Sequence, residues 1–151
     1  MQRLEIDKRP GTYALILRAA TTQTVRIGRL GDLVLQPGYY IYVGSAFGPG
    51  GLAARVGRHL RKEKRLRWHI DYLRAACEVE EVWWTCDSVR RECEWANKLR
   101  ELPGTVVPMV GFGSSDCGCE THLVWVETTA KLERNEWDVK SMLEISVQEY
   151  A

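Results

Sequence analysis

The first third of the chain alternates short apolar runs with glycine and proline, a pattern that predicts strands. Residues 11–17 are aliphatic and aromatic, which indicates a buried strand. Residues 24–27 and 32–35 read as half-buried partners across a glycine turn. The aromatic run 39–43 follows another turn signal at Pro37. We therefore expect an antiparallel meander here.

The middle of the chain changes to helical spacing. Leu52, Val56 and Leu60 recur every four residues, which predicts a helix ending near Arg61. A second, shorter helix is expected over 68–73. Residues 79–86 then predict a further strand.

The last third is expected to hold two helices and a strand. Asp87 or Ser88 can cap a helix that ends near Leu99. A strand over 122–126 and a terminal helix over 132–147 follow. The whole pattern predicts an α+β fold with a small central antiparallel or mixed sheet, flanking helices, an inserted β-hairpin and a C-terminal helix.

Size and composition suit a single soluble domain. The chain has 151 residues, of which 45% are hydrophobic, so it can bury a sizeable core. Its start alternates charged and apolar residues, unlike a secretory signal or a transit peptide, and no apolar run nears the roughly 20 residues of a membrane helix. Five cysteines without a signal indicate free thiols. We expect a cytoplasmic protein with no membrane partner.

The net charge of +1 conceals one basic segment. Only Glu63 opposes its positive charges, and His59 lies within it. Such a local concentration is typical of a phosphate-binding surface. Its basic residues are Arg55, Arg58, Arg61, Lys62, Lys64, Arg65 and Arg67.

Two of these residues share a face of the expected helix. Arg55 and His59 are four positions apart, and Arg55 lies close in sequence to Tyr42, Gly44 and Ser45. A glycine-rich loop precedes the helix, and helix N-termini favour anions. Together these features predict contact with a phosphate group.

The order of these motifs resembles the GIY-YIG endonuclease superfamily. Gly11-Thr12-Tyr13 looks like the GIY element, and Tyr42-Val43-Gly44 looks like the YIG element. The residues that match the run after them are Ser45, Leu52, Arg55 and His59. The inserted hairpin and the loop at 111–119 are similar to a branch of small prokaryotic proteins catalogued as a domain of unknown function. The resemblance implies a nuclease domain over 10–127, with 128–151 as a helical extension packed on it.

The resemblance also implies catalytic roles. Tyr13 would act as general base, helped by a nearby cation that lowers its pKa from about 10. Arg55 would stabilise charge on the phosphoryl group, and Tyr42 and His59 would position or polarise the phosphate and the water.

A glutamate on a later helix would hold Mg²⁺ or Mn²⁺, as the resemblance implies. The candidates are Glu92 and Glu94, and the pattern slightly favours Glu92 because Trp95 and Ala96 follow it at i+3 and i+4. Trp68 could stack on a base. The residues expected to contact nucleic acid are Gly44, Ser45, Arg58, Arg61, Lys62, Lys64, Arg65 and His69.

Cys117, Cys119 and His122 could bind zinc, with Cys93 or Asp116 as a fourth ligand. The Cys-x-Cys spacing is tighter than usual, which favours a hydrogen-bonded loop instead. Three functions remain open: a metal-dependent endonuclease acting on DNA, including structured or damaged DNA; a nucleic-acid-binding module without catalysis; and a zinc-stabilised interaction domain. The sequence does not define protein partners.

Overall fold

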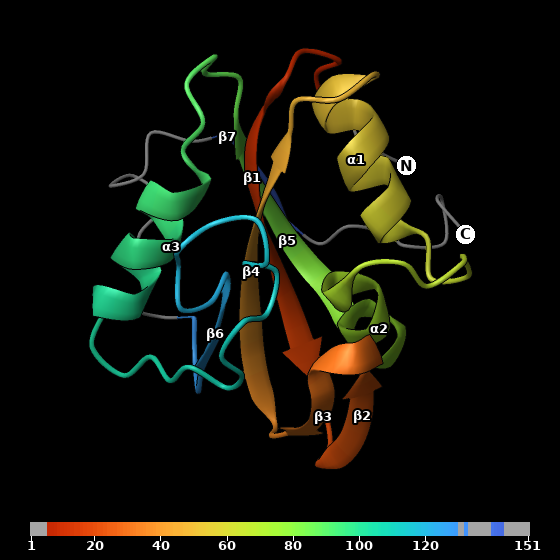
Figure 1. The fold of residues 1–151 in the computed structure, drawn as a ribbon, viewed down its shortest axis with the longest axis vertical. Helices are drawn as coiled ribbons and strands as arrows, with labels where there is room; N and C mark the ends of the chain where they lie inside the picture. The colour runs from red at the N-terminus through yellow and green to blue at the C-terminus, as the bar shows by residue number, and fades with distance from the viewer. Residues whose placement is uncertain (1–5, 130–131, 133–139, 144–151) are drawn as a thin grey trace.

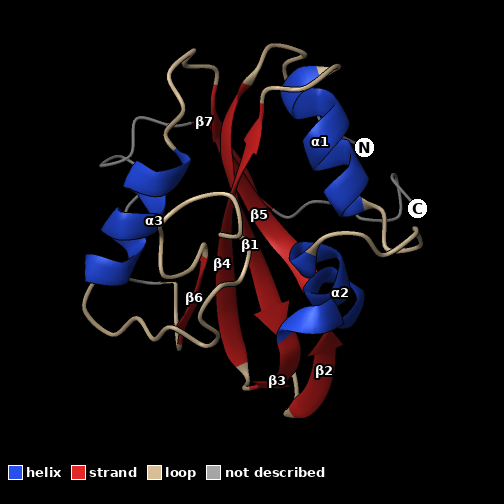
Figure 2. Ribbon diagram, viewed as in Figure 1, coloured by secondary structure: helices blue, strands red, loops and turns tan. Residues whose placement is uncertain are grey.

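A five-stranded antiparallel sheet lies between helices in the computed structural model, which describes residues 6–129, 132 and 140–143. The strand order is β6-β4-β1-β5-β7. These strands are β1 (Gly11–Ala19), β4 (Gly38–Ala46), β5 (Glu78–Thr85), β6 (Leu123–Val126) and β7 (Lys140–Leu143). Helices α1 (Gly51–Leu60) and α2 (His69–Ala76) cover one face, and α3 (Glu92–Glu101) covers the other (Figure 2). The predicted α+β class is confirmed.

Alternation along β1 divides the core into two parts. Tyr13, Leu15 and Leu17 belong to the cluster under α1 and α2, whereas Ala14 and Ile16 belong to the cluster under α3. Successive side chains of a strand point to opposite faces of a sheet. A strand buried on both faces is therefore apolar throughout, as the predicted strand over 11–17 is.

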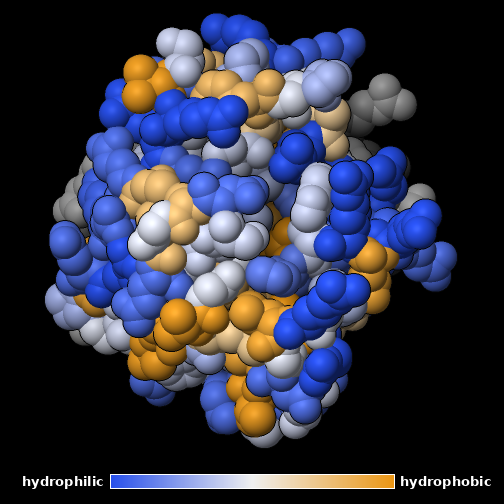
Figure 3. All heavy atoms as spheres, viewed as in Figure 1, coloured by the Kyte–Doolittle hydropathy of each residue, from blue (hydrophilic) through white to orange (hydrophobic). Residues whose placement is uncertain are grey.

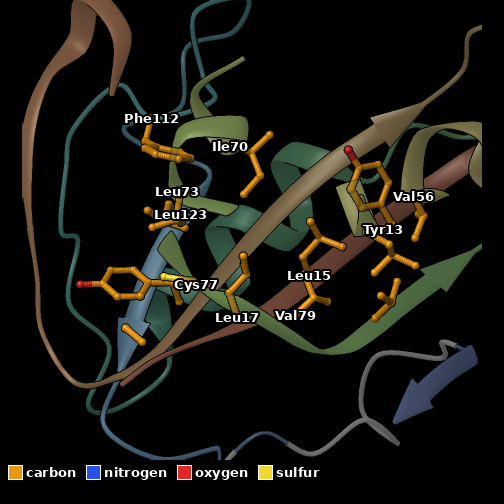
Figure 4. Packing of buried hydrophobic residues seen from close by; sticks show 14 of the residues in the cluster. Tyr13, Leu15, Leu17, Val56, Ile70, Leu73, Cys77, Val79, Phe112 and Leu123 are labelled. Carbon is orange, nitrogen blue, oxygen red and sulfur yellow. The ribbon is translucent and has the colours of Figure 1, made fainter. Parts of the chain in front are cut away.

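The helical spacing of α1 packs its apolar side chains on the sheet. Leu52, Val56 and Leu60 are fully buried, and Val56 lies beside Tyr13 and Leu15 in Figure 4. Burial of each such side chain stabilises the fold by about 1.5–3 kcal/mol. The predicted helix is confirmed.

Two buried charged side chains join α1 to α2. Arg74 donates to the carbonyl oxygens of His59 and Leu60 at 3.0 Å, so it satisfies groups that the end of α1 leaves unpaired. Asp71 accepts two hydrogen bonds from Arg58 and two from the backbone N–H groups of Arg67 and Trp68. These contacts fix the turn that carries Trp68.

The meander was wrong in its pairing. Strands β2 (Gln23–Ile27) and β3 (Gly31–Leu35), joined by the short helix η1 (Gly28–Leu30), form a separate two-stranded sheet. Strand β4 pairs instead with β1 and β6. The hairpin is thus an insertion between β1 and β4, as predicted, and it packs beside α2.

The start of α3 was also predicted wrongly. The helix begins at Glu92 rather than after Asp87 or Ser88. Asp87 accepts hydrogen bonds from the Val89 N–H and from the Arg91 guanidinium, which hold the segment before the helix in a turn.

The terminal helix is wrong over Lys140–Leu143, which forms the strand β7 along β5. An edge strand such as β5 offers unpaired backbone groups that a further strand can satisfy. The rest of the predicted helix lies outside the described residues, except for Leu132. Within the described ranges, no helix has the length and apolar character to cross a membrane. Hydrophilic residues cover much of the face shown in Figure 3.

Candidate functional site

A pocket of about 530 Å³ opens where α1, α3, β4 and the loop before β6 meet. It brings together five residues singled out from the sequence, which are Tyr42, Ser45, Arg55, His69 and Glu92. They come from four separate elements, so only the folded chain creates this wall. The pocket is therefore the candidate functional site.

Tyr13 lies behind this wall rather than in it. Its side chain is 1% exposed, and its hydroxyl lies 2.5 Å from Nε2 of His59, which is also buried. The rings of Tyr13 and Tyr42 lie 6.4 Å apart, and their hydroxyls form a hydrogen bond. A polar chain thus runs from the pocket through Tyr42 and Tyr13 to His59.

Burial sets the ionisation of this chain. It raises the pKa of Tyr13 well above its ordinary value, and the opposing charge of Arg55 does not overcome it. The predicted lowering of this pKa is therefore wrong for the protein without ligands. Burial also raises the pKa of Tyr42 and lowers the pKa of His59 to about 3. All three groups are neutral at pH 7.

Arg55 places a positive charge on the wall of the pocket. Its guanidinium stacks on the Trp68 ring at 4.3 Å from the ring centre, and it donates to the Ser45 carbonyl at 3.4 Å. Arg58 lies 4.2 Å from the centre of the same ring. Trp68 therefore acts as a platform that orients two arginines.

Glu92 is the pocket glutamate. Ser45 Oγ donates to Oε2 of Glu92, and Nδ1 of His122 lies 2.7 Å from Oε1. Burial alone would raise the pKa of Glu92, but the hydrogen bonds from His122 and Ser45 outweigh it and lower the pKa. Glu94 instead points away and pairs with Arg91 at 3.0 Å on the surface. Between the two candidates, the structure places only Glu92 in the pocket.

The rest of the basic segment has other partners. Arg58 pairs with Asp71, Lys62 pairs with Glu78, and Lys64 donates to backbone carbonyl oxygens. Partial burial lowers the pKa of Lys64 to about 8. Within the described structure, the predicted contacts that do not line the pocket are Gly44, Arg58, Arg61, Lys62, Lys64 and Arg65.

The N-terminus of α1 does not present free donors as expected. The N–H groups of Leu52 and Ala53 donate to the carbonyl oxygens of Arg9 and Asp7 at 3.0 and 2.9 Å. The segment before β1 therefore occupies the place that an anion would take.

His69 lines the opposite wall. Its Nδ1 accepts a hydrogen bond of 2.9 Å from the Gly113 N–H, which leaves Nε2 to carry the proton. The glycine-rich loop is thereby tied to α2. A positive φ of 68° at Gly113, together with its close approach to Tyr42, requires glycine there.

Several wall residues were not predicted as site residues. These are Phe47, Arg67, Arg90, Ser115 and Asp116, together with Gly48 and Gly113. Arg90 lies 4.6 Å from the Phe47 ring centre. No periodic pattern marks these residues because they lie outside the helices and strands, although Arg67 was visible as part of the basic segment.

A second cluster adjoins the pocket. The side chains of Cys93, Cys117, Cys119 and His122 place their potential ligand atoms within 4.8 Å of one another. Cys117 Sγ lies 3.3 Å from Nε2 of His122. This set could bind a metal ion. Between the two suggested fourth ligands, Cys93 belongs to the cluster, whereas Asp116 lines the pocket.

Comparison with known protein families adds one finding. The family model described as Domain of unknown function DUF123 matches residues 12–144, which is most of the chain. No curated protein and no solved structure matches. The matched range includes the two tyrosines, Arg55, Glu92 and the thiol cluster. The chain therefore belongs to the DUF123 family.

Proposed function

We propose that the protein is a metal-dependent endonuclease that hydrolyses phosphodiester bonds of DNA, including structured or damaged DNA. The observation that carries the proposal is the convergence of Tyr42, Arg55 and Glu92 on one pocket from three elements. Phosphodiester hydrolysis needs a proton acceptor, positive charge and a carboxylate for a cation, and this wall offers each of them. The choice of DNA rests on the resemblance to GIY-YIG nucleases.

The carboxylate of Glu92 fits a hard divalent cation such as Mg²⁺ or Mn²⁺. Each of its oxygens has one protein contact, so lone pairs remain on the pocket side. Asp116 offers a second carboxylate on the same wall. Such a cation, when bound, would stabilise charge on the phosphoryl oxygens.

The buried hydroxyl chain supplies a path for the proton of the attacking water. The proton passes to Tyr42, the Tyr42 proton passes to Tyr13, and the Tyr13 proton passes to Nε2 of His59. Each tyrosine stays neutral, and the imidazole becomes an imidazolium. In this scheme Tyr13 accepts and donates in turn, while Arg55 and the neighbouring Arg67 hold the phosphate.

The alternative is a nucleic-acid-binding module without catalysis. The raised pKa of Tyr13 and the low pKa of His59, about 3, favour it, because both oppose proton transfer. It would use the same arginines and Trp68 for binding, with no requirement for a divalent cation.

Cleavage of labelled single-stranded, duplex, flapped and branched DNA, and of RNA, separates the two. The assay compares Mg²⁺, Mn²⁺ and EDTA for wild type, Tyr13→Phe, Tyr42→Phe, Arg55→Gln and Glu92→Gln. Each variant should lose at least about 100-fold in rate. Glu94→Gln is the matched control and should cut normally, because Glu94 faces away from the pocket. Binding without cutting on every substrate would overturn the endonuclease and favour the module.

A further inference from the structure

We infer that Cys93, Cys117, Cys119 and His122 bind one zinc ion, which through His122 fixes the carboxylate of Glu92 in the pocket. The zinc site itself does not depend on the proposed nuclease activity. Its effect on Glu92 deepens that proposal, because it assigns the carboxylate a structural support.

The four side chains have the composition of a structural zinc site. Three thiols and one imidazole are ligands that zinc prefers, in a closed tetrahedral set. Zinc bonds of about 2.0–2.3 Å would separate the ligand atoms by about 3.6–3.8 Å. The observed atoms lie within 4.8 Å of one another, and Sγ of Cys117 lies 3.3 Å from Nε2 of His122. Small side-chain rotations therefore suffice.

The ligands come from two segments that need a link. Cys93 lies in the first turn of α3, whereas the other three belong to the loop before β6 and its end. In Figure 1 this loop runs between α3 and β4. Zinc would join the loop to the helix at the point where both reach the pocket. Each thiol would release its proton to solvent as its sulfur binds the ion.

The second nitrogen of His122 connects this site to the pocket. With Nε2 on the thiol side, Nδ1–H points at Oε1 of Glu92, 2.7 Å away. Histidines that bind metals commonly donate their other N–H to a carboxylate, which fixes the ring and its tautomer. Here the carboxylate that orients the ligand is also the pocket glutamate, since Ser45 holds its other oxygen.

The zinc content of the full chain, purified without added metal, gives the first test. We expect about one zinc per chain by elemental analysis, and three sulfur and one nitrogen ligands by X-ray absorption. Absorption at the zinc edge uses the wild type alone, so it does not depend on whether variants fold. A protein without zinc, or one in which Cys93, Cys117 or Cys119 forms a disulfide, would overturn the inference.

Variants test which thiols bind. Cys93→Ser and Cys119→Ser should lower the zinc content, and after replacement by Co²⁺ they should alter the thiolate absorption band. Cys86→Ser is the matched control, because Cys86 lies outside the cluster and should leave both unchanged. Equal loss in Cys86→Ser and Cys93→Ser would contradict the assignment.

The link to Glu92 has its own readout. Glu92→Gln weakens the acceptor for His122, so a competing chelator should remove zinc at about 10–100-fold lower concentration than from wild type. Glu94→Gln should behave like wild type. Equal retention by wild type and Glu92→Gln would overturn the link. These measurements use no nucleic acid: an inactive protein with zinc would sink only the nuclease, and an active one without zinc only this inference.

Discussion

Gly44 lies directly opposite Tyr13 in the β1–β4 ladder, and the Tyr13 ring fills the space where a side chain at Gly44 would lie. A Cβ atom there would collide with the tyrosine hydroxyl. The glycine therefore allows the buried hydroxyl to reach His59. Its position next to Ser45 predicted contact with nucleic acid, but its observed contact is with the tyrosine.

Gly44→Ala should displace Tyr13 and destabilise the protein by about 1–3 kcal/mol, because the core has no room for the added methyl group. Urea unfolding measures this change. Gly57→Ala is the control, since a Cβ atom there meets no atom within 4 Å and alanine favours the middle of α1. A stable Gly44→Ala protein with an unchanged Tyr13 environment would contradict the packing argument.

Stability should fall in acid partly because of His59. Its folded pKa is lowered to about 3 by burial, whereas the unfolded pKa is about 6.5. Between these values the unfolded chain gains a proton that the folded chain does not, so stability is full above about pH 6.5 and falls toward pH 3.

His59→Gln should remove this dependence. Unfolding free energies measured from about pH 7 to about pH 4 should change less steeply in the variant, by about 1 kcal/mol per pH unit. Other groups titrate in both proteins and cancel in the comparison. Parallel curves for the two proteins would show that His59 does not titrate as proposed.

The Arg58–Asp71 pair should contribute far more than a surface pair. Asp71 is fully buried and accepts four hydrogen bonds, so Asp71→Asn should cost about 3 kcal/mol of unfolding free energy. Asp32→Asn breaks the exposed pair with Arg26 and should cost less than about 1 kcal/mol. Denaturant unfolding of both variants checks the contrast, and similar costs would contradict it.

Nucleic-acid binding should depend on the pocket arginines rather than on the whole basic segment. Arg55→Gln and Arg67→Gln should each reduce the slope of log binding constant against log salt by about 1. Lys62→Gln should leave it unchanged, because Lys62 pairs with Glu78 outside the pocket. Fluorescence anisotropy with labelled DNA gives the slopes. Equal effects at all three positions would indicate a broad surface instead.

The sequence predicted the elements better than their partners. Local periodicity was sufficient for β1 and α1, because both bury apolar residues at a fixed spacing. Strand pairing is non-local, so the meander placed β4 beside the wrong strand. The terminal helix failed over Lys140–Leu143 because the open edge of β5 determines the structure there.

The same distinction applies to the site. The motif residues Tyr42 and Arg55 were found because their types and order are visible along the chain. The contact between Glu92 and His122 was not predicted, because 30 positions separate residues that only folding brings together. Nor could charge alone show that Lys62 and Arg58 already have acidic partners.

The position of Glu92 between Ser45 and His122 also bears on synthesis of the protein. The ribosome makes β1, β4 and α1 first, but His122 emerges only after the loop that precedes β6. A nascent chain therefore has its tyrosines and arginines long before its pocket carboxylate is held in place. If the site cuts nucleic acid, a growing or truncated chain that stops short of His122 remains harmless to the transcript beside it.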